Sequence, residues 1–291
     1  MKVLITLVSL FFVAISYASQ HIEYGIPTSQ LILERNAYTV SYDKVKRTPT
    51  WVAYTIKPDF LNNPKRKSRF KSFKADPDIP NPVVQKDYTH SGYARGHLAP
   101  WAISGGDRDG DGLYALLDKS DPQADADEEK TIFEINYMSN IAPQNQRCFN
   151  GAGGVWYKLE SYLQNKIVDN QQRTVSVYAG SIFYPNEPIE TLGPESDIAI
   201  PHAFYKLILE KQANGELTAL PFLFPHYTEN LDKKTCQFPD VKFYDREHLV
   251  TVDELEVATG LDFFGQLDDQ EESVLEAASS LDVWNQYYGI D

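Results

Sequence analysis

The fold and site of this chain are decided by the stretch Tyr93-Ala94-Arg95-Gly96-His97-Leu98-Ala99-Pro100. The neutral imidazole of a histidine accepts a proton near neutral pH, and a neighbouring arginine supplies the positive charge that a phosphate requires. A glycine between them lets the backbone approach a ligand closely. The stretch therefore suits hydrolysis of a phosphodiester, but three residues alone are not specific. The rest of the site must come from flanking sequence.

An amide-rich segment follows further along the chain. Asn140 begins the run Asn140-Ile141-Ala142-Pro143-Gln144, and Asn145 and Asn150 come soon after. Amides at this density usually form turns, but their oxygens also suit Mg²⁺, which keeps several waters and needs few protein ligands. Glu160 lies on a predicted helix after this segment, where its carboxylate can hold a metal-bound water.

Hydrophobic periodicity outlines the elements. The segments 38–42 and 51–56 alternate as an antiparallel pair, 133–138, 174–179 and 204–209 are predicted strands, and Asn214-Gly215 predicts a hairpin between 211 and 217. Helical spacing covers 155–163, Thr251 and Glu254 form a predicted capping box, and an amphipathic helix is expected after 268. The proline-rich stretch 58–82 is predicted as a surface loop. Without βαβ alternation, the class is α+β, with a mixed, mainly antiparallel sheet and packed helices.

The two ends of the chain differ in character. Lys2 precedes an apolar run over 3–15, and Ser16-Tyr17-Ala18 matches a cleavage site. We predict a signal peptide over 1–18, with an uncleaved anchor as the alternative, and one domain over 19–291. No later segment is apolar for long enough to span a bilayer. The mature protein is therefore expected to be secreted or periplasmic and free of the membrane.

Cysteine content and charge limit the function classes. In an oxidising compartment Cys148 and Cys236 can pair, two buried thiols being the alternative, and no Cys/His cluster indicates zinc. The net charge of −14 argues against attachment to nucleic acid by global charge. A local basic stretch remains, as a phosphate-steering patch or merely a solvated loop, and contains Lys57, Lys65, Arg66, Lys67, Arg69, Lys71 and Lys74.

Several blocks together resemble the DNA/RNA non-specific endonuclease family, whose members have a ββα-metal core. The blocks follow the family order between about residues 35 and 267, which is far more specific than the Arg-Gly-His triplet. They are Ser91-Gly92-Tyr93-Ala94-Arg95-Gly96-His97-Leu98-Ala99-Pro100, Tyr137-Met138-Ser139-Asn140-Ile141-Ala142-Pro143-Gln144, Trp156-Tyr157-Lys158-Leu159-Glu160, Val177-Tyr178-Ala179-Gly180-Ser181-Ile182-Phe183, Ile200-Pro201-His202-Ala203-Phe204-Tyr205-Lys206 and Thr259-Gly260-Leu261-Asp262-Phe263-Phe264.

The resemblance implies a role for each matching residue. His97 is the implied general base, Asn150 the direct Mg²⁺ ligand, and Glu160 the carboxylate that orients metal-bound water. Asn140 is implied to support His97 and the metal loop. Arg95 and Arg69 are the implied phosphate contacts. Mg²⁺, with Mn²⁺ as a substitute, would stabilise the leaving 3′ oxygen, so DNA and RNA substrates would yield 5′-phosphates.

Three departures from the family pattern bear on these roles. Ala94 stands where the family usually has an aspartate before Arg-Gly-His, so the support of Arg95 differs. Gln164 replaces an arginine one helical turn after Glu160, with Lys158 or Lys166 as substitute phosphate contacts. Extra residues between Asn150 and Trp156, including Gly153 and Gly154, leave Asn145 as an alternative metal ligand.

An acidic insert over about 104–130 suggests a second metal site. Counting from Asp107, acidic residues fall at the first, third, fifth and twelfth positions, with glycine at the sixth. These are Asp107, Asp109, Asp111 and Asp118, in the order of an EF-hand loop. The hypothesis is a structural Ca²⁺ loop without flanking helices, and the alternative is a solvated acidic turn.

Two other functions are alternatives to that of a metal-dependent nuclease. Ala94 and Gln164 suggest a catalytically weak or inactive relative that binds nucleic acid or a protein partner. The retained residues His97, Asn140, Asn150 and Glu160 argue against it. The acidic insert suggests a calcium-stabilised extracellular binding protein, which leaves the family blocks unexplained. The sequence does not identify a protein inhibitor or the preferred nucleic acid.

Overall fold

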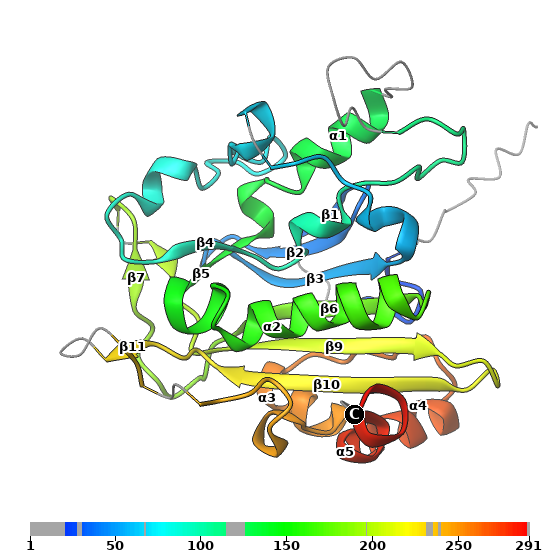
Figure 1. The fold of residues 1–291 in the computed structure, drawn as a ribbon. Coiled ribbons are helices and arrows are strands. Elements are labelled where there is room, and N and C mark those ends of the chain that lie inside the picture. The colour runs from blue at the N-terminus through cyan, green and yellow to red at the C-terminus, as the bar shows by residue number, and fades with distance from the viewer. Residues whose placement is uncertain are drawn as a thin grey trace, which may run out of the picture.

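The computed structural model describes residues 21–27, 31–66, 68–114, 126–195, 197–230, 235–237 and 240–289 (Figure 1). The predicted signal peptide over 1–18 and the proposed calcium ligand Asp118 lie outside these ranges. Among the described residues, no helix combines the length and apolar character needed to cross a bilayer.

The centre of the molecule is a six-stranded sheet in which every neighbouring pair is antiparallel. Its order is β1-β2-β3-β6-β9-β10, and the strands are β1 (Leu31–Glu34), β2 (Thr39–Asp43), β3 (Thr48–Ile56), β6 (Val175–Ile182), β9 (Ala203–Lys211) and β10 (Leu217–Pro225). The predicted pair over 38–56, the two core strands and the hairpin at Asn214-Gly215 are confirmed. Smaller two-stranded pairs are β4 (Ala94–His97) with β5 (Ile141–Gln144), β7 (Thr191–Leu192) with β8 (Ile198–Ala199), and β11 (Glu229–Asn230) with β12 (Thr235–Cys236).

Helices cover both faces of this sheet, as the α+β prediction required. They are α1 (Ala126–Glu134), α2 (Val155–Tyr162), α3 (Val252–Thr259), α4 (Asp269–Glu276) and α5 (Ser280–Val283). Shorter 3-10 or π-helical segments are η1 (Pro58–Leu61), η2 (Ser68–Lys71), η3 (Gln85–Tyr88), η4 (Trp101–Ile103), η5 (Met138–Asn140), η6 (Gln146–Asn150), η7 (Leu163–Asn170), η8 (Arg246–His248) and η9 (Trp284–Tyr288). The capping box of α3 forms as predicted, and the tail packs on the protein through Leu275, Trp284 and Tyr288.

Alternation along β9 separates two buried clusters. Phe204 and Ile208 face the cluster that contains α2, whereas Tyr205 and Leu207 face the cluster beneath α3 and α4. Figure 1 shows α2 lying along the strands and the C-terminal helices gathered beside β10. Lys206 has the parity of Phe204 and Ile208, so a lysine is placed among apolar side chains under α2.

The β4–β5 pair and α2 form the ββα arrangement that carries the site. In its antiparallel register His97 faces Ile141 and Gly96 faces Ala142, and the chain then passes through η6 into α2. The predicted strand over 133–138 is wrong. Its residues close α1 instead, because Ile135 N–H donates to Thr131 and Tyr137 N–H donates to Glu134.

The stretch 58–82 is more ordered than the predicted surface loop. The side chains of Phe60, Phe70 and Asp76 in this stretch are buried. The backbone of Lys74 forms an isolated parallel β-bridge with that of Tyr137. The buried Asp76 carboxylate accepts a hydrogen bond from Arg35 at 2.6 Å and another from Ser139. This segment is therefore anchored next to the chain that leads into β5.

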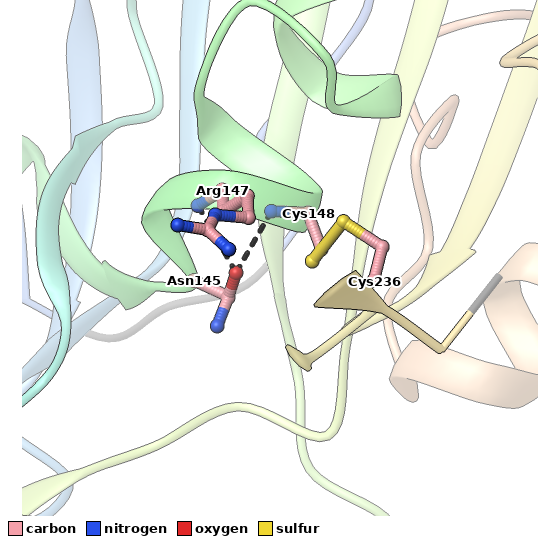
Figure 2. Close-up of a disulfide and its surroundings, with 4 residues drawn as sticks. All are labelled: Asn145, Arg147, Cys148 and Cys236. Atoms are coloured by element: carbon pink, nitrogen blue, oxygen red, sulfur yellow. Dashed lines mark hydrogen bonds between the residues drawn. A yellow bond between two sulfur atoms is a disulfide. The ribbon is translucent and has the colours of Figure 1, made fainter. Parts of the chain in front are cut away.

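A disulfide joins Cys148 in η6 to Cys236 in β12 across 88 residues, with the two Cα atoms 5.4 Å apart, which confirms the predicted pair (Figure 2). Figure 2 also shows the side-chain oxygen of Asn145 directed at the start of η6. This oxygen accepts hydrogen bonds from Arg147 N–H at 3.1 Å and Cys148 N–H at 2.8 Å. The bond thus fixes the segment between β5 and α2 to a distant part of the chain.

Candidate active site

His97 ends β4 and is held from three sides. Its imidazole lies 5.3 Å from the ring of Phe73, measured between centroids. The indole Nε1 of Trp156 in α2 donates a hydrogen bond to the backbone carbonyl of His97 at 3.3 Å. The third contact is between His97 Nε2 and the side-chain oxygen of Asn136, also at 3.3 Å. These contacts leave the imidazole partly buried between α1 and α2.

Asn136 determines which imidazole nitrogen can act as a base. Its amide nitrogen donates to the backbone carbonyls of Phe70 and Ile132, at 3.1 and 3.4 Å, so its oxygen must face His97. That oxygen only accepts hydrogen bonds, and it also accepts one from Arg66 at 3.0 Å. His97 Nε2 therefore carries the proton, which leaves Nδ1 as the proton acceptor.

The surroundings of His97 keep its imidazole neutral. Burial, and after it the positive charge of Arg66, lower the pKa of His97 to about 3, against the opposing effect of the hydrogen bond to Asn136. The ordinary pKa of histidine is near 6.5. His97 is therefore neutral throughout the neutral and mildly acidic range, with the lone pair of Nδ1 unprotonated.

Two guanidinium groups share the ring of Phe73. The Cζ of Arg95 lies 4.8 Å from the ring centroid and that of Arg66 lies 4.9 Å from it, while Arg66 also lies 5.5 Å from the ring of Trp101. Neither arginine has a carboxylate partner within the described part of the chain. Two unneutralised cations beside a neutral imidazole form a site for an anion such as a phosphate.

Arg95 is thus supported by an aromatic ring, in place of the aspartate that the family usually has at the position of Ala94. Ala94 faces Gln144 across the β4–β5 pair and supplies no charge, while the face of Phe73 receives the guanidinium. Arg69, the arginine expected to contact phosphate, belongs to η2, and its side chain lies outside the described part of the structure. Arg66 lies beside His97, where it shares the side-chain oxygen of Asn136 with the imidazole, and the role expected of Arg69 stays a prediction.

Asn140 fixes the chain that follows His97. Its side-chain oxygen accepts from Ala99 N–H at 2.9 Å, and its nitrogen donates to the carbonyls of Ala99 and Ile135 at 2.9 and 3.0 Å. Leu98 N–H donates to the Asn140 carbonyl at 3.0 Å. Asn140 is fully buried, and its amide forms hydrogen bonds with backbone groups. It therefore holds in place the chain that leaves β4.

The two candidate metal-binding asparagines differ in the hydrogen bonds of their side chains. The Asn145 oxygen caps η6, as Figure 2 shows, so it is directed at backbone N–H groups. The Asn150 amide makes no side-chain hydrogen bond in the described structure, and this partly exposed residue ends η6 just before α2. Geometry favours Asn150 over Asn145 as the ligand, and the assignment of Asn150 stays a prediction.

Glu160 of α2 is paired with the lysine beneath the helix. Lys206 Nζ donates to Glu160 Oε1 at 3.1 Å and to the Tyr54 hydroxyl at 3.0 Å, and it lies 3.8 Å from the centroid of the Trp156 ring. Lys206 is fully buried, whereas the Glu160 side chain is 14% exposed. Burial raises the pKa of Glu160, and the ion pair with Lys206 opposes that shift.

A buried glutamine lies against the centre of β4. Neither side-chain polar atom of Gln144 has a hydrogen-bond partner among the described residues, and the side chain is fully buried. A Cβ at Gly96 would lie 2.0 Å from Gln144 Oε1, which explains the glycine between Arg95 and His97. Gln144 shares one face of the β4–β5 pair with Ala94 and Gly96, whereas Arg95 and His97 point to the other face.

The residues expected to hold the metal fit a hard divalent cation. Asn150 offers a neutral amide oxygen and Glu160 a carboxylate, which are the oxygen ligands and water-holding groups that Mg²⁺ prefers. No nitrogen or sulfur donor set among the described residues competes here. The fit supports a cation at Asn150 without identifying it.

The acidic insert forms a separate carboxylate cluster. Ligand atoms of Asp107, Asp109 and Glu128 lie within 4.8 Å of one another. Asp111, whose oxygen accepts from Leu113 N–H at 2.7 Å, does not belong to this group. Glu128 was not expected among the ligands, since it enters from α1 rather than from the loop. The structure thus contains an acidic metal-site candidate that differs in composition from the predicted loop.

Four residues of the candidate site were not identified as site residues from the sequence, for different reasons. Asn136 fell within a segment assigned to a strand, and Arg66 was one of many basic residues in the stretch 57–74. Phe73 lies in the stretch 58–82, which was predicted as a surface loop. Lys206 carried a signal that could have been used, because a lysine at an inward-facing position of a core strand requires a buried partner.

Comparison with known proteins gives a consistent result. The sequence profile of the DNA/RNA non-specific endonuclease family matches residues 18–270. Mitochondrial nuclease EXOG of Xenopus laevis is 30% identical over 260 residues, which cover 84% of this chain and 62% of that protein. The chain therefore spans about three fifths of that relative's length.

Two further relatives are matched over more of their length. Nuclease C1 of Cunninghamella echinulata is 28% identical, covering 85% of this chain and 88% of that protein. The nuclease of Serratia marcescens is also 28% identical, with 87% and 83% covered. A chain in the crystal structure of the EndoG/EndoGI complex superposes with a TM-score of 0.67 at 24% identity, covering 90% of this chain and 97% of that one, which shows a shared fold.

Proposed function

The chain belongs to the DNA/RNA non-specific endonuclease family, and on that premise we propose that it is a secreted or periplasmic Mg²⁺-dependent nuclease that cuts DNA and RNA. The observation that carries the proposal is the juxtaposition of His97, fixed as the tautomer with a free Nδ1, with the unneutralised guanidinium groups of Arg66 and Arg95. Such a site combines a base with positive charge where a phosphate would lie.

The base step follows from the hydrogen bonds of His97. Its Nδ1 takes a proton from water as the oxygen attacks phosphorus, and Nε2–H continues to donate to Asn136. Because burial and Arg66 hold the pKa of His97 low, the imidazolium releases the proton readily after the attack. Asn136 and Asn140 act as positioning residues, one on the ring and the other on the backbone of β4.

Charge on the phosphate is met by the chain's own cations. Arg66 and Arg95 face the non-bridging oxygens from the ring of Phe73, which suits contacts with the backbone rather than with base edges. Asn150 would hold Mg²⁺, with Mn²⁺ as substitute, and Glu160 would orient its water. When bound, the cation supplies charge stabilisation for the leaving 3′ oxygen.

The test is cleavage of plasmid DNA and of RNA by the mature protein with and without Mg²⁺. We expect both to be cut only with the divalent cation, and His97→Ala to reduce kcat by about 100-fold or more. If the wild type cuts neither substrate with any of several divalent cations, the proposal fails. Such a protein could still bind nucleic acid as a silent relative, which a gel-shift measurement would detect. Full activity of His97→Ala would exclude it as the base.

The acidic cluster suggests a second, structural cation. We propose that Asp107, Asp109 and Glu128 bind Ca²⁺ and thereby join the insert to α1. Isothermal titration of the His97→Ala variant with Ca²⁺ should release or absorb heat, and Asp109→Asn should abolish that signal. If the His97→Ala protein gives no binding heat at millimolar Ca²⁺, the cluster is a solvated acidic turn.

A further inference from the structure

A groove lies on the outer side of α2, away from the ion pair of Glu160 with Lys206. It encloses about 440 Å³ and is lined by Tyr157, Lys158, Ser161, Tyr162, Asn165, Lys166, Lys242, Phe243 and Tyr244. Six of these nine lining residues belong to α2 and η7, and the other three form the segment 242–244. Lining residues Tyr157 and Ser161 flank Glu160 in the sequence, so one helix carries both the groove and a site residue.

The charge of the groove is opposite to that of the whole chain. Its only charged lining residues are Lys158, Lys166 and Lys242, although the net charge of the protein is −14. None of these ammonium groups forms an ion pair with a described residue. Such a concentration of unneutralised positive charge in an acidic protein fits a polyanion.

Aromatic rings accompany the lysines. Tyr157 is 45% exposed although it follows the fully buried Trp156, whose indole contacts His97. On the opposite wall the ring of Tyr244 stacks on Trp284, with centroids 5.9 Å apart and planes 7° from parallel. The groove therefore has a fixed wall and an accessible ring, the combination that single-stranded nucleic acid uses for stacking and backbone contact.

We propose that this groove is a subsite for single-stranded nucleic acid, which holds the part of the substrate that flanks the scissile phosphate. Lys158, Lys166 and Lys242 contact phosphates, and Tyr157 stacks on a base. The subsite rests on the proposed nuclease function. It also supplies the backbone contact that is missing at Gln164, one turn after Glu160 on the same helical region.

Binding is tested with a fluorescein-labelled oligothymidylate and the mature protein in EDTA, which prevents cleavage, by anisotropy over a range of salt concentrations. For Lys158→Gln/Lys166→Gln/Lys242→Gln we expect the slope of log K against log[salt] to become shallower by about 2, because each lost phosphate contact in a single strand removes about 0.7. The matched control is Lys44→Gln/Lys86→Gln/Lys211→Gln, which removes the same charge from exposed lysines outside the groove and should leave the slope unchanged.

Stacking is tested separately at Tyr157. Tyr157→Ala should weaken binding about tenfold, whereas Tyr157→Phe, which keeps the ring, should bind like the wild type. Unchanged binding by Tyr157→Ala would overturn the stacking assignment and with it the single-stranded specificity. Melting temperatures of all variants, compared with the wild type, show whether each remains folded.

Cleavage kinetics separate this inference from the proposed function. With Mg²⁺, the triple groove variant should cut the oligonucleotide with a raised KM and a nearly unchanged kcat. A wild type that neither binds nor cuts oligonucleotides overturns the proposed function and the subsite together. A wild type that cuts, alongside a groove variant with the same salt slope and the same KM, overturns the subsite alone.

Discussion

At the scale of single residues, Phe73 and Asn136 organise the site without chemistry of their own. Phe73 presents one ring to His97, Arg95 and Arg66, which replaces the carboxylate that Ala94 lacks. Asn136 fixes the imidazole through a side chain that is itself held by two backbone carbonyls. The sequence predicted His97 and Arg95 from adjacent letters, but it could not predict partners that come from distant segments.

Arg66 and Asn136 shift the pKa of His97 in opposite directions, so replacing each of them should move the pH profile in a predictable direction. His97 acts as a base only when neutral, so kcat/KM falls as pH falls through its pKa. Burial remains the main cause of the low pKa in all variants, but Arg66 lowers it further and the bond to Asn136 raises it. Arg66→Gln should therefore move the acidic limb of the kcat/KM profile to higher pH, and Asn136→Ala should move it to lower pH. Shifts in the same direction would contradict this electrostatic account.

The buried pair of Lys206 and Glu160 predicts an asymmetric cost. Lys206→Met leaves the Glu160 carboxylate without its partner, and we expect unfolding to become easier by about 3 kcal/mol. Adding Glu160→Gln should restore part of that stability, because no charge then remains in the pair. Activity should stay low in the double variant, since it lacks the Glu160 carboxylate that the proposed metal site needs. Urea denaturation and cleavage rates check the two parts, and additive losses of stability would argue against coupling.

At the scale of elements, β4, β5 and α2 are placed by close contacts that sequence periodicity does not reveal. The four-residue strands are too short for an alternating pattern, so they were recognised only through their family blocks. The long strands β3, β6 and β9 and helix α2 were predicted, because their buried faces repeat over enough residues. The segment 133–138 was assigned to a strand because buried apolar residues of a helix end also fit a short strand.

The entry into α2 gives a prediction with a matched control. A Cβ at Gly154 would lie 2.0 Å from the Phe149 carbonyl oxygen, whereas one at Gly153 would lie 3.8 Å from the Arg147 oxygen. Gly154→Ala should displace the backbone beside Asn150 and weaken activation by Mg²⁺ by about tenfold or more. Gly153→Ala should resemble the wild type. Titration of the cleavage rate with Mg²⁺ checks both, and equal behaviour of the two variants would show that the close approach is unimportant.

At the scale of the whole molecule, the sheet separates two buried clusters of described residues, and the cluster under α2 contains Trp156, which contacts His97 of the candidate site. The α+β class and the antiparallel sheet were predictable, since strand patterns occur without regular βαβ alternation. The composition of the carboxylate cluster was not, because Glu128 reaches Asp107 and Asp109 from α1, and spacing within the loop cannot indicate a ligand outside it. The basic groove was visible only in part, because Lys158 and Lys166 could be named as phosphate contacts from their place near Gln164, whereas Lys242 comes from a distant segment.

The disulfide gives a prediction for the stability of the whole chain. It closes a loop of 88 residues, and the chain-entropy model assigns such a loop a stabilisation of about 4 kcal/mol. Cys236→Ser with Cys148→Ser should therefore lower the free energy of unfolding by about that amount, measured in urea under oxidising conditions. The wild type in a strong reductant should behave like the double variant, and an unchanged midpoint in both would contradict the prediction.

The place of this bond has a consequence for the cell that makes the protein. Cys148 lies between Asn145, which caps η6, and Asn150, which ends it, so the bond closes over the very segment that would hold the cation. Thiols stay reduced in the cytosol and oxidise only after export. If the protein is exported as proposed, the segment that would hold the cation lacks this cross-link while the new chain is still near the nucleic acids of the cell that makes it. The bond would then form after export, so that the same step that releases the protein would also complete its metal-binding segment.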